Sequence, residues 1–381
     1  MKVKLSIIND IKFDKNKLLK SFTDVKGFFT NIDVVKCYKS VFKKKVIVNN
    51  IGFFISLFIL VLLVICIILF YAKFFKILKK QIHIISKAIK FKYINKKVCF
   101  KKCTRKDKKN SNNNFISKSK ISVKKTIKLN NKEMTTSGNK KASYNLIKIL
   151  SYNDTEKNEL SYEKAFLYDK RTFLQYYYSL LKIKNLFLFA FFPNKDYNLP
   201  LIKIFLFFFS FFTQLTINAL YFTDDTMHKI YIDKGKFDFI YNIPQIIFSS
   251  LISYNIDFLI SYLSLSEKDV LRIKNMKIKK KKNIKEKVSA VLSKLSLKFG
   301  FFFPFSFTIV LIFGFYVVCF CGVYKNTQIN LITDTGFSFC LTLITPFIVC
   351  LLPSILRIVS LKANDKKGKI MYKIANYLEI I

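Results

Sequence analysis

The sequence contains no Trp and only 9 Gly and 6 Pro among its 381 residues. Scarce glycine and proline argue against a β-rich or turn-rich fold, because tight turns depend on these two residues. The sequence also has no paired-carboxylate, Ser-His-Asp or Cys-His arrangement and no Gly-rich phosphate loop. We therefore predict no enzymatic activity, no catalytic residue and no bound cofactor.

Metal and disulfide patterns are equally weak among the eight cysteines. Cys99 and Cys103 resemble half of a zinc site, but no second Cys pair or His pair follows them, and zinc needs four convergent ligands. Only Cys37 falls where an oxidising compartment could reach it, because most of the others lie in apolar runs. We predict no metal site and no disulfide framework.

The chain is rich in hydrophobic residues and in positive charge. Hydrophobic residues make up 51% of it, with 43 Phe, and 66 Lys and Arg stand against 23 Asp and Glu, a net charge of +43. Lys, Asn, Ile, Phe and Tyr are all encoded by A/T-rich codons, so codon bias is an alternative source of this composition. The positions of the charges therefore carry more information than their total.

Five apolar runs are long enough to cross a membrane. An α-helix rises ~1.5 Å per residue, so about 20 apolar residues cross the ~30 Å hydrocarbon core of a bilayer. The runs are 51–71, 204–222, 239–265, 299–324 and 335–356. So many apolar runs in one chain leave too little amphipathic sequence to cover them in a soluble protein. We predict an all-α polytopic membrane protein with one N-terminal span followed by a four-helix transmembrane bundle.

A sixth apolar stretch, Leu186 to Phe192, is too short to span. It is interpreted as an interfacial or re-entrant piece, or as a helix that packs beneath the bundle.

Charge alternates between the loops. Segment 72–200 has 31 basic and 8 acidic residues, loop 266–298 has 12 and 3, and the tail from residue 357 has 6 and 2. Loops 223–238 and 325–334 are nearly neutral, with 3 basic against 4 acidic residues and one of each. Because basic loops tend to stay in the cytoplasm, we expect the last four spans to begin and end there.

This topology places residues 1–50 outside, although they carry 12 Lys against 4 acidic residues. The inverse orientation would move the net +23 of residues 72–200 outside, which is a larger violation. The predicted layout is an outer segment 1–50, a first span 51–71, a cytoplasmic basic helix and disordered linker 72–160, and a four-span domain 161–381. The plasma membrane is expected rather than an internal membrane.

The cytoplasmic segments contain two amphipathic patterns. Ile82, Ile85, Ile89 and Tyr93 share one face of a Lys-rich helix over 79–102, for which we predict docking on anionic lipid head groups and not simple exposure to solvent. A second helix over 284–295 is expected to lie on the bilayer or to pack on the first.

Residues 104–158 are rich in Lys, Ser, Asn and Thr, and they are interpreted as a disordered linker. Binding of nucleic acid by this linker is not predicted, because neither interleaved aromatic residues nor a folded module supports it.

Two polar residues within the spans are candidate functional residues. Asp257 interrupts the third span, and an ionisable residue at such a depth is a functional candidate by default, although a satisfied structural contact is the alternative. Asn218 lies in the second span with other polar residues and could hydrogen-bond to the third. Pro residues in or near the last three spans could kink them around a cavity.

Several stretches are similar to a known family. They include Tyr168-Asp-Lys-Arg-Thr-Phe-Leu-Gln-Tyr-Tyr, Phe191-Phe-Pro-Asn-Lys-Asp-Tyr-Asn, Thr226-Met-His-Lys-Ile-Tyr and Leu352-Pro-Ser-Ile-Leu-Arg-Ile. From Ser161 to Ile381, together with the preceding span, the chain resembles an uncharacterised family of polytopic protist (ciliate-type) transmembrane proteins. The resemblance implies the same topology and supplies no active site. Proteins of this kind often carry a large extracellular region before the first span, where this chain has some 50 residues.

The functional expectation is a non-enzymatic membrane anchor or interaction protein. The alternative is an ion channel or small-solute transporter that uses the bundle over 204–356, because this bundle contains Asn218, Asp257 and the prolines. The expected partners are the lipid bilayer and the anionic lipids of its cytoplasmic leaflet, with no nucleic acid.

Overall fold

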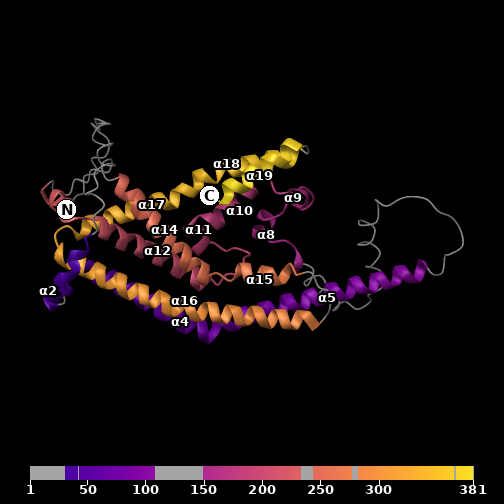
Figure 1. The fold of residues 1–381 in the computed structure, drawn as a ribbon, viewed down its shortest axis with the longest axis horizontal. Coiled ribbons are helices and arrows are strands. Elements are labelled where there is room, and N and C mark those ends of the chain that lie inside the picture. The colour runs from indigo at the N-terminus through magenta and orange to yellow at the C-terminus, as the bar shows by residue number, and fades with distance from the viewer. Residues whose placement is uncertain are drawn as a thin grey trace.

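The computed structural model describes residues 31–41, 43–107, 149–232, 243–276, 282–363 and 366–380. These residues form an elongated all-α structure in which no strand occurs (Figure 1). The long helices are α4 (Ile51–Leu69), α5 (Phe75–Asp107), α12 (Pro200–Tyr221), α14 (Ile243–Ser264), α16 (Lys282–Val323) and α17 (Gln328–Val349). The π-helical turn η3 (Phe70–Phe74) joins α4 to α5.

Shorter helices lie at the two ends of the long ones. One end carries η2 (Ile32–Cys37), α2 (Tyr38–Val41), α3 (Lys44–Ile47) and α13 (Asp224–Ile232). The other carries α8 (Asp154–Asn158), α9 (Tyr162–Tyr168), α10 (Phe173–Lys184), α11 (Leu186–Phe191), α15 (Glu267–Lys274), α18 (Leu351–Ala363) and α19 (Lys366–Ile380). We call α8, α9, α10, α15, α18 and α19 together the cap.

Among the described residues, four helical stretches are long and apolar enough to cross a membrane, and they correspond to four of the five predicted spans. They are Ile51–Ile94, Pro200–Tyr221, Ile284–Val323 and Gln328–Ala363. The chain is therefore a helical membrane protein. Helix α14 carries most of the predicted third span, 239–265, but it is not among these four stretches. Residues 239–242 lie outside the described residues, and a crossing by this helix stays a prediction.

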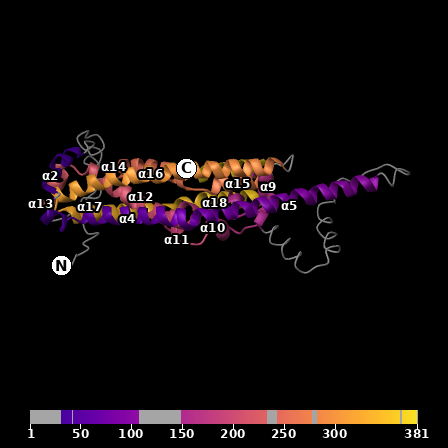
Figure 2. The ribbon, with the colours of Figure 1, turned by 90° about the horizontal axis from the view of Figure 1, so that it is seen from below.

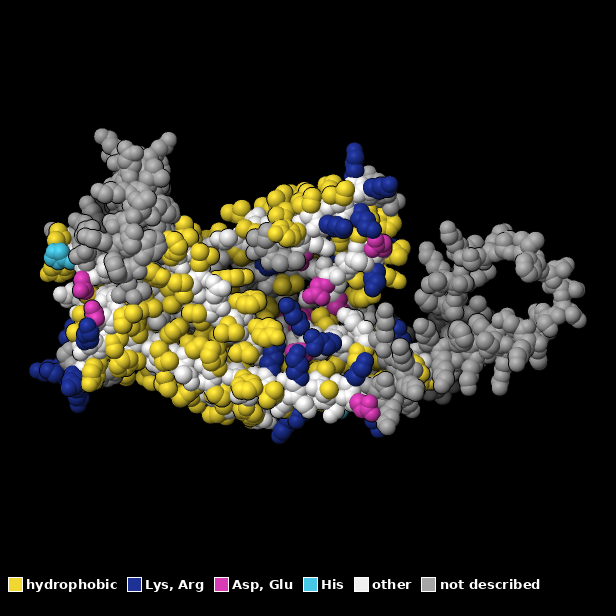
Figure 3. Space-filling model, viewed as in Figure 1, with side chains coloured by type: hydrophobic (Ala, Val, Ile, Leu, Met, Phe, Trp, Pro, Cys, Tyr) yellow, Lys and Arg dark blue, Asp and Glu magenta, His cyan; other side chains and the backbone are white. Residues whose placement is uncertain are grey.

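Large apolar side chains cover the outer faces of the long helices. On α4, for example, Phe58 is 52% exposed and Ile68 is 60% exposed. Figure 3 shows hydrophobic side chains over most of the left and middle of one face, with charged side chains gathered on its right part and at its far left edge. A contiguous apolar surface of this extent needs an apolar environment, which a bilayer supplies.

The first span is part of the bundle, contrary to the predicted separation from the other four. Helix α4 packs along α16 and against α12. At Gly52 an added Cβ would lie 2.8 Å from the carbonyl oxygen of Val317, and one at Gly314 would lie 3.2 Å from the Cβ of Ser56. Small residues allow such close approach of membrane helices, so the spacing Gly52-x-x-x-Ser56 fixes α4 on α16.

The predicted basic helix over 79–102 is confirmed as an extension of the first span, through η3 and α5. Its predicted docking on lipid through the apolar stripe is wrong. Ile82, Ile85 and Ile89 are at most 4% exposed, because α5 packs against α15 and α16. The predicted helix over 284–295 is the first part of α16. Of the two positions expected for it, on the bilayer or against the first amphipathic helix, the second is correct, because α16 packs on α5.

The predicted fifth span, 335–356, is interrupted. Helix α17 ends at Val349, and α18 begins two residues later at Leu351. Proline has no backbone N–H to donate to the carbonyl oxygen four residues earlier. Pro353 therefore lacks one helical hydrogen bond across this junction. Beyond it, α18 and α19 pack side by side as a helical hairpin.

Segments predicted as irregular or interfacial are ordered. Residues 108–148 of the predicted linker 104–158 lie outside the described residues, but its end forms α8, where Glu156 and Asn158 are at most 5% exposed. Disorder is therefore wrong for this end of the linker, because its side chains are packed. The stretch Leu186 to Phe192 forms the short helix α11, which packs on α12 and α10.

The two ends of the molecule are built from different segments of the chain. At one end, Asn31 Nδ2 donates to the carbonyl oxygen of Phe222 at 2.9 Å, and Gln328 Nε2 donates to the carbonyl oxygen of Asn49 at 2.9 Å. The segments predicted to lie outside thus meet there. The cap and α5 form the other end, where α5 projects beyond the bundle in both ribbon views (Figure 2). The segments at each end are thus the ones that loop charge predicted to share one side of the membrane.

Candidate functional site

A cluster of buried polar side chains lies in the cap, around Arg357. This residue stands on α18, two turns beyond the break in the last span, and its side chain is fully buried. A buried charge is tolerated only when it is paired and hydrogen-bonded. The surrounding segments of the cap supply partners for Nη1 and Nη2, whereas Nε is buried without a partner among the described residues.

Two of the partners are the carbonyl oxygens of the last two residues of α8, the first of which also accepts from the backbone nitrogen of Leu160 at 3.4 Å. Arg357 donates from Nη2 to the carbonyl oxygen of Lys157 at 2.6 Å and from Nη1 to that of Asn158 at 2.9 Å. Helix α8 begins with a capping box in which Asn153 and Glu156 bond each other's backbone. The capped helix thus presents its C-terminal end to a guanidinium, where positive charge is favourable.

Acidic and aromatic side chains complete the surroundings of Arg357. Its Nη2 lies 3.5 Å from Asp169 Oδ2, and its Nη1 lies 4.0 Å from Glu379 Oε2. The guanidinium also stacks over the rings of Tyr176 and Tyr372, 4.8 and 4.7 Å from their centroids. These contacts join α18 to α8, α10, α19 and the turn after α9.

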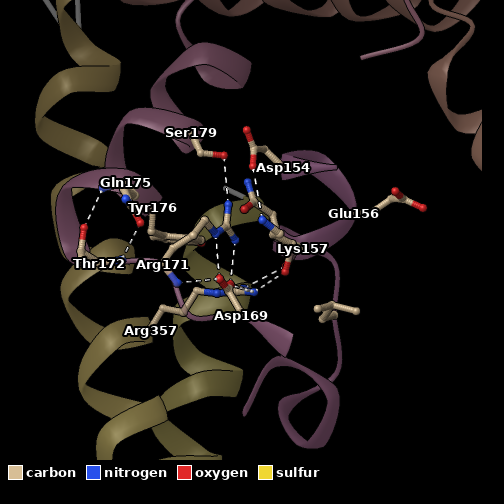
Figure 4. A network of polar contacts seen from close by, with 12 residues as sticks. Asp154, Glu156, Lys157, Asp169, Arg171, Thr172, Gln175, Tyr176, Ser179 and Arg357 are labelled. Atoms are coloured by element: carbon tan, nitrogen blue, oxygen red, sulfur yellow. Dashed lines mark hydrogen bonds and ion pairs between the residues drawn. The ribbon is translucent and has the colours of Figure 1, made fainter. Parts of the chain in front are cut away.

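Asp169 is held by a second arginine. Arg171 donates from Nε and Nη2 to the two carboxylate oxygens of Asp169, each at 2.7 Å, and from Nη1 to Ser179 Oγ at 3.1 Å (Figure 4). The capping box of Thr172 and Gln175 starts α10 next to this turn. Burial alone would raise the pKa of Asp169, but the hydrogen bonds and charge of Arg171, with the charge of Arg357, lower it below its ordinary value.

Glu379 joins the C-terminal helix to the same cluster. Its Oε2 accepts a hydrogen bond of 3.0 Å from the hydroxyl of Tyr176. Burial raises the pKa of Glu379 above its ordinary value, although the charge of Arg357 and the bond from Tyr176 act against the rise. The cluster therefore contains two arginines and two acids at close range.

A second polar cluster, which we call the clasp, fastens the segment before α12 to α15. Lys274 pairs with Glu156, and Lys203 pairs with Asp196 at 2.6 Å, with all four side chains at most 7% exposed. Asn198 Oδ1 accepts from the backbone nitrogen of Glu267 at 3.0 Å, which holds the start of α15.

The acid at the start of α15 has an altered pKa. Burial, followed by the charge of Asp196, raises the pKa of Glu267 to about 7. Its two carboxylate oxygens accept from Asn153 and Asn198. Both clusters are networks of contacts within the protein, in which side chains bind other side chains and backbone groups. In the part of the chain that the structure describes, no three His, Cys, Asp or Glu side chains are arranged to hold a metal ion.

The two predicted intramembrane residues do not meet. Asn218 on α12 donates to Thr335 Oγ1 on α17 at 3.1 Å, not to the third span as predicted. Asp257 on α14 instead accepts from Ser210 Oγ on α12. Asn218 thus makes a satisfied helix–helix contact, whereas Asp257 Oδ1 is buried and finds no partner among the described residues.

Prediction from the sequence missed the cluster around Arg357. The arginine directly follows an apolar run, which is the usual position of a residue that reaches back toward water. A usable signal was present in the two capping-box patterns, Asn153-x-x-Glu156 and Thr172-x-x-Gln175. These patterns mark ordered helices, and the first of them lies within the predicted linker 104–158.

Comparison with known proteins adds no functional assignment. No protein-family profile matches the chain, and no curated protein or solved structure matches it.

Proposed function

We propose that this chain is a non-enzymatic membrane anchor or interaction protein, in which the helical bundle holds the cap in a fixed position at the membrane. The supporting observation is the fully buried Arg357, whose contacts join the continuation of the last span to four other parts of the cap. A rigid connection of this kind suits a protein that presents a surface. It does not require a moving lid or an open cavity.

The long helices support the same role. Helix α16 has 42 residues and is about 63 Å long at ~1.5 Å per residue. The hydrocarbon core is only ~30 Å thick, so about half of α16 extends beyond it. This extension packs with α5 and α15 and makes one body of the bundle and the cap.

Hydrogen exchange of the protein in lipid nanodiscs tests this role. We expect the amides of α8, α10 and α19 to exchange as slowly as those of α12, because all are packed in one body. In Arg357→Met, exchange in α8 and α19 should accelerate while that in α12 stays unchanged. If the cap of the wild-type protein exchanges as fast as the projecting end of α5, the cap is not held and the proposal fails.

A channel or small-solute transporter that uses the bundle over 204–356 is the second candidate. It is favoured by buried polar atoms within the bundle that have no partner among the described residues. These are Gln214 Nε2, Asp257 Oδ1, Ser306 Oγ and Asp334 Oδ2. If the protein is an anchor and not a transporter, the purified protein in liposomes should conduct no sodium, potassium or chloride. Flux that Asp257→Asn abolishes would favour the transporter instead.

The orientation and the membrane are also proposed. The basic loops and the cap would face the cytoplasm, where they are suited to anionic lipid head groups, and residues 31–50 would face outward. We propose the plasma membrane, following the resemblance to the protist membrane family.

A further inference from the structure

The seam between α12 and α14 contains an acid without a charged partner. Asp257 Oδ2 accepts a hydrogen bond from Ser210 Oγ, and the hydroxyl of Thr213 also lies at this carboxyl group. The other oxygen, Oδ1, is buried and has no partner among the described residues. One oxygen of the carboxyl group is therefore hydrogen-bonded, and the other is buried without a partner among the described residues.

The seam is polar beyond this one residue. Gln214 lies one helical turn from Ser210 on α12, is 4% exposed, and its Nε2 has no partner in the described part of the chain. On α14, Ser249 and Ser253 precede Asp257 at four-residue spacing and are 1% and 5% exposed. Residues four apart share a face of a helix, so the polar positions of each helix form a row. The two helices pack along each other over this length.

No cation among the described residues pairs with Asp257. Within the described part of the chain, the main contacts of α14 are with α12 and α16. The charged residue of α12, Lys203, binds Asp196, and Lys294 and Lys298 of α16 bind Asp269.

Lys298 approaches α14 beyond Asp257, where it lies over the ring of Tyr262 at 5.4 Å. Lys285, Glu286 and Lys287, near the start of α16, lie at least three turns further toward the cap. The described side chains of the facing helices therefore do not supply the charge that would balance an ionised Asp257.

We propose that Asp257 is a reversible proton-binding site within the bundle, which goes beyond the anchor role. A carboxylate without a charged partner at this depth is unfavourable, and binding one proton on Oδ1 removes the charge. The Ser210 hydroxyl donates to Oδ2 and stabilises the ionised form, so the carboxyl group can also release the proton. Binding and release of the proton make and break one O–H bond at Oδ1 and change no other covalent bond.

Dicyclohexylcarbodiimide tests the site in intact membranes. This apolar reagent takes up the carboxyl proton on one nitrogen while the carboxyl oxygen bonds to its central carbon, and mass spectrometry locates the product. We expect labelling at Asp257 that falls at least about tenfold over a few pH units from acid to alkaline, since each unit changes the protonated-to-ionised ratio tenfold. Ser210→Ala should retain labelling to higher pH, because it removes a bond to the ionised form.

Infrared difference spectra between acid and alkaline pH provide a second measurement that does not depend on reagent access. The wild-type spectrum should contain the carbonyl band of a protonated carboxyl group that Asp257→Asn lacks. Identical spectra together with no labelling at any pH would overturn the proposal, and so would labelling that does not change with pH. Protection by sodium at constant pH would assign the site to a metal cation and would also overturn it.

Discussion

At the scale of single residues, Arg357 is the charge most completely removed from water in the cap. Its guanidinium is planar, so it donates along its edge to two carbonyl oxygens while its faces stack on Tyr176 and Tyr372. Lysine has no such planar group and could not make both sets of contacts. The residue type therefore follows from the geometry of the site.

Arg357→Met should lower the free energy of unfolding by about 3–5 kcal/mol, because it leaves buried acids and helix carbonyls without their partner. Unfolding in detergent, followed by circular dichroism, measures the change. Lys362→Met is the matched control, since Lys362 lies on the same helix and is exposed. The control should stay within about 0.5 kcal/mol of the wild type. Equal stability of the two variants would contradict the role of Arg357.

Glu267 gives the cap a dependence on pH. Its pKa in the folded protein is about 7, above the ordinary value of 4.5, so the folded state binds its proton more tightly than the unfolded state. The contribution of Glu267 to the free energy of unfolding is therefore fully present below pH 4.5 and is lost as the pH rises to about 7. Glu267→Gln should remove this loss and flatten the profile of unfolding midpoint against pH. Parallel profiles for variant and wild type would show that Glu267 does not contribute.

At the same scale, sequence and structure agree on which residues are unusual and differ on their roles. Asp257 stands out in the sequence as a charge in an apolar run, and the structure leaves one of its oxygens without a partner in the described residues. Asn218 stands out equally, but Thr335 satisfies it from α17. Periodicity cannot reveal that partner, because it lies 117 residues away in the chain.

At the scale of elements, the contact between α4 and α16 depends on small side chains. Gly52→Ala should lower the free energy of unfolding by about 1–3 kcal/mol, because the new Cβ would lie 2.8 Å from both the Val317 carbonyl oxygen and Cys321 Sγ. Gly300→Ala, on α16, is the control, since no heavy atom lies within 4 Å of its added Cβ. That change should be neutral or should stabilise the helix by up to about 1 kcal/mol. A harmless Gly52→Ala would mean that the two helices are not in close contact.

The existence of the spans could be predicted because hydropathy and length reflect the solvent of each helix directly. The packing of the first span could not be predicted in the same way. Its apolar residues are compatible with a lone helix, and only Gly52 and Ser56 mark the face that meets α16. The stripe of Ile82, Ile85 and Ile89 likewise identifies an apolar face, but lipid and protein are equally suitable covers for it.

At the scale of the whole molecule, loop charge and helix packing give the same grouping of segments. The segments predicted to lie outside meet at one end through Asn31 and Gln328, while the basic segments form the cap at the other end. Charge alone predicts which segments lie together, because loops rich in Lys and Arg are kept on the cytoplasmic side of the membrane. The networks within the cap could not be predicted, since they join residues about 200 positions apart, such as Tyr176 and Glu379.

The central claim is that the helices span the membrane as a bundle and hold the cap on the cytoplasmic side. Glycosylation in microsomes, which reports the side of the membrane on which each acceptor lies, tests this claim most directly. The sequence contains one natural glycosylation acceptor, Asn153-Asp154-Thr155, which lies in the cap. A second acceptor can be inserted at Gly235, in the loop predicted to lie outside. A bundle that spans the membrane with its cap in the cytoplasm predicts glycosylation at the inserted acceptor and none at Asn153. Modification of Asn153 with no modification at the inserted acceptor would contradict this orientation, and modification of both would show that the helices between them do not separate the two ends.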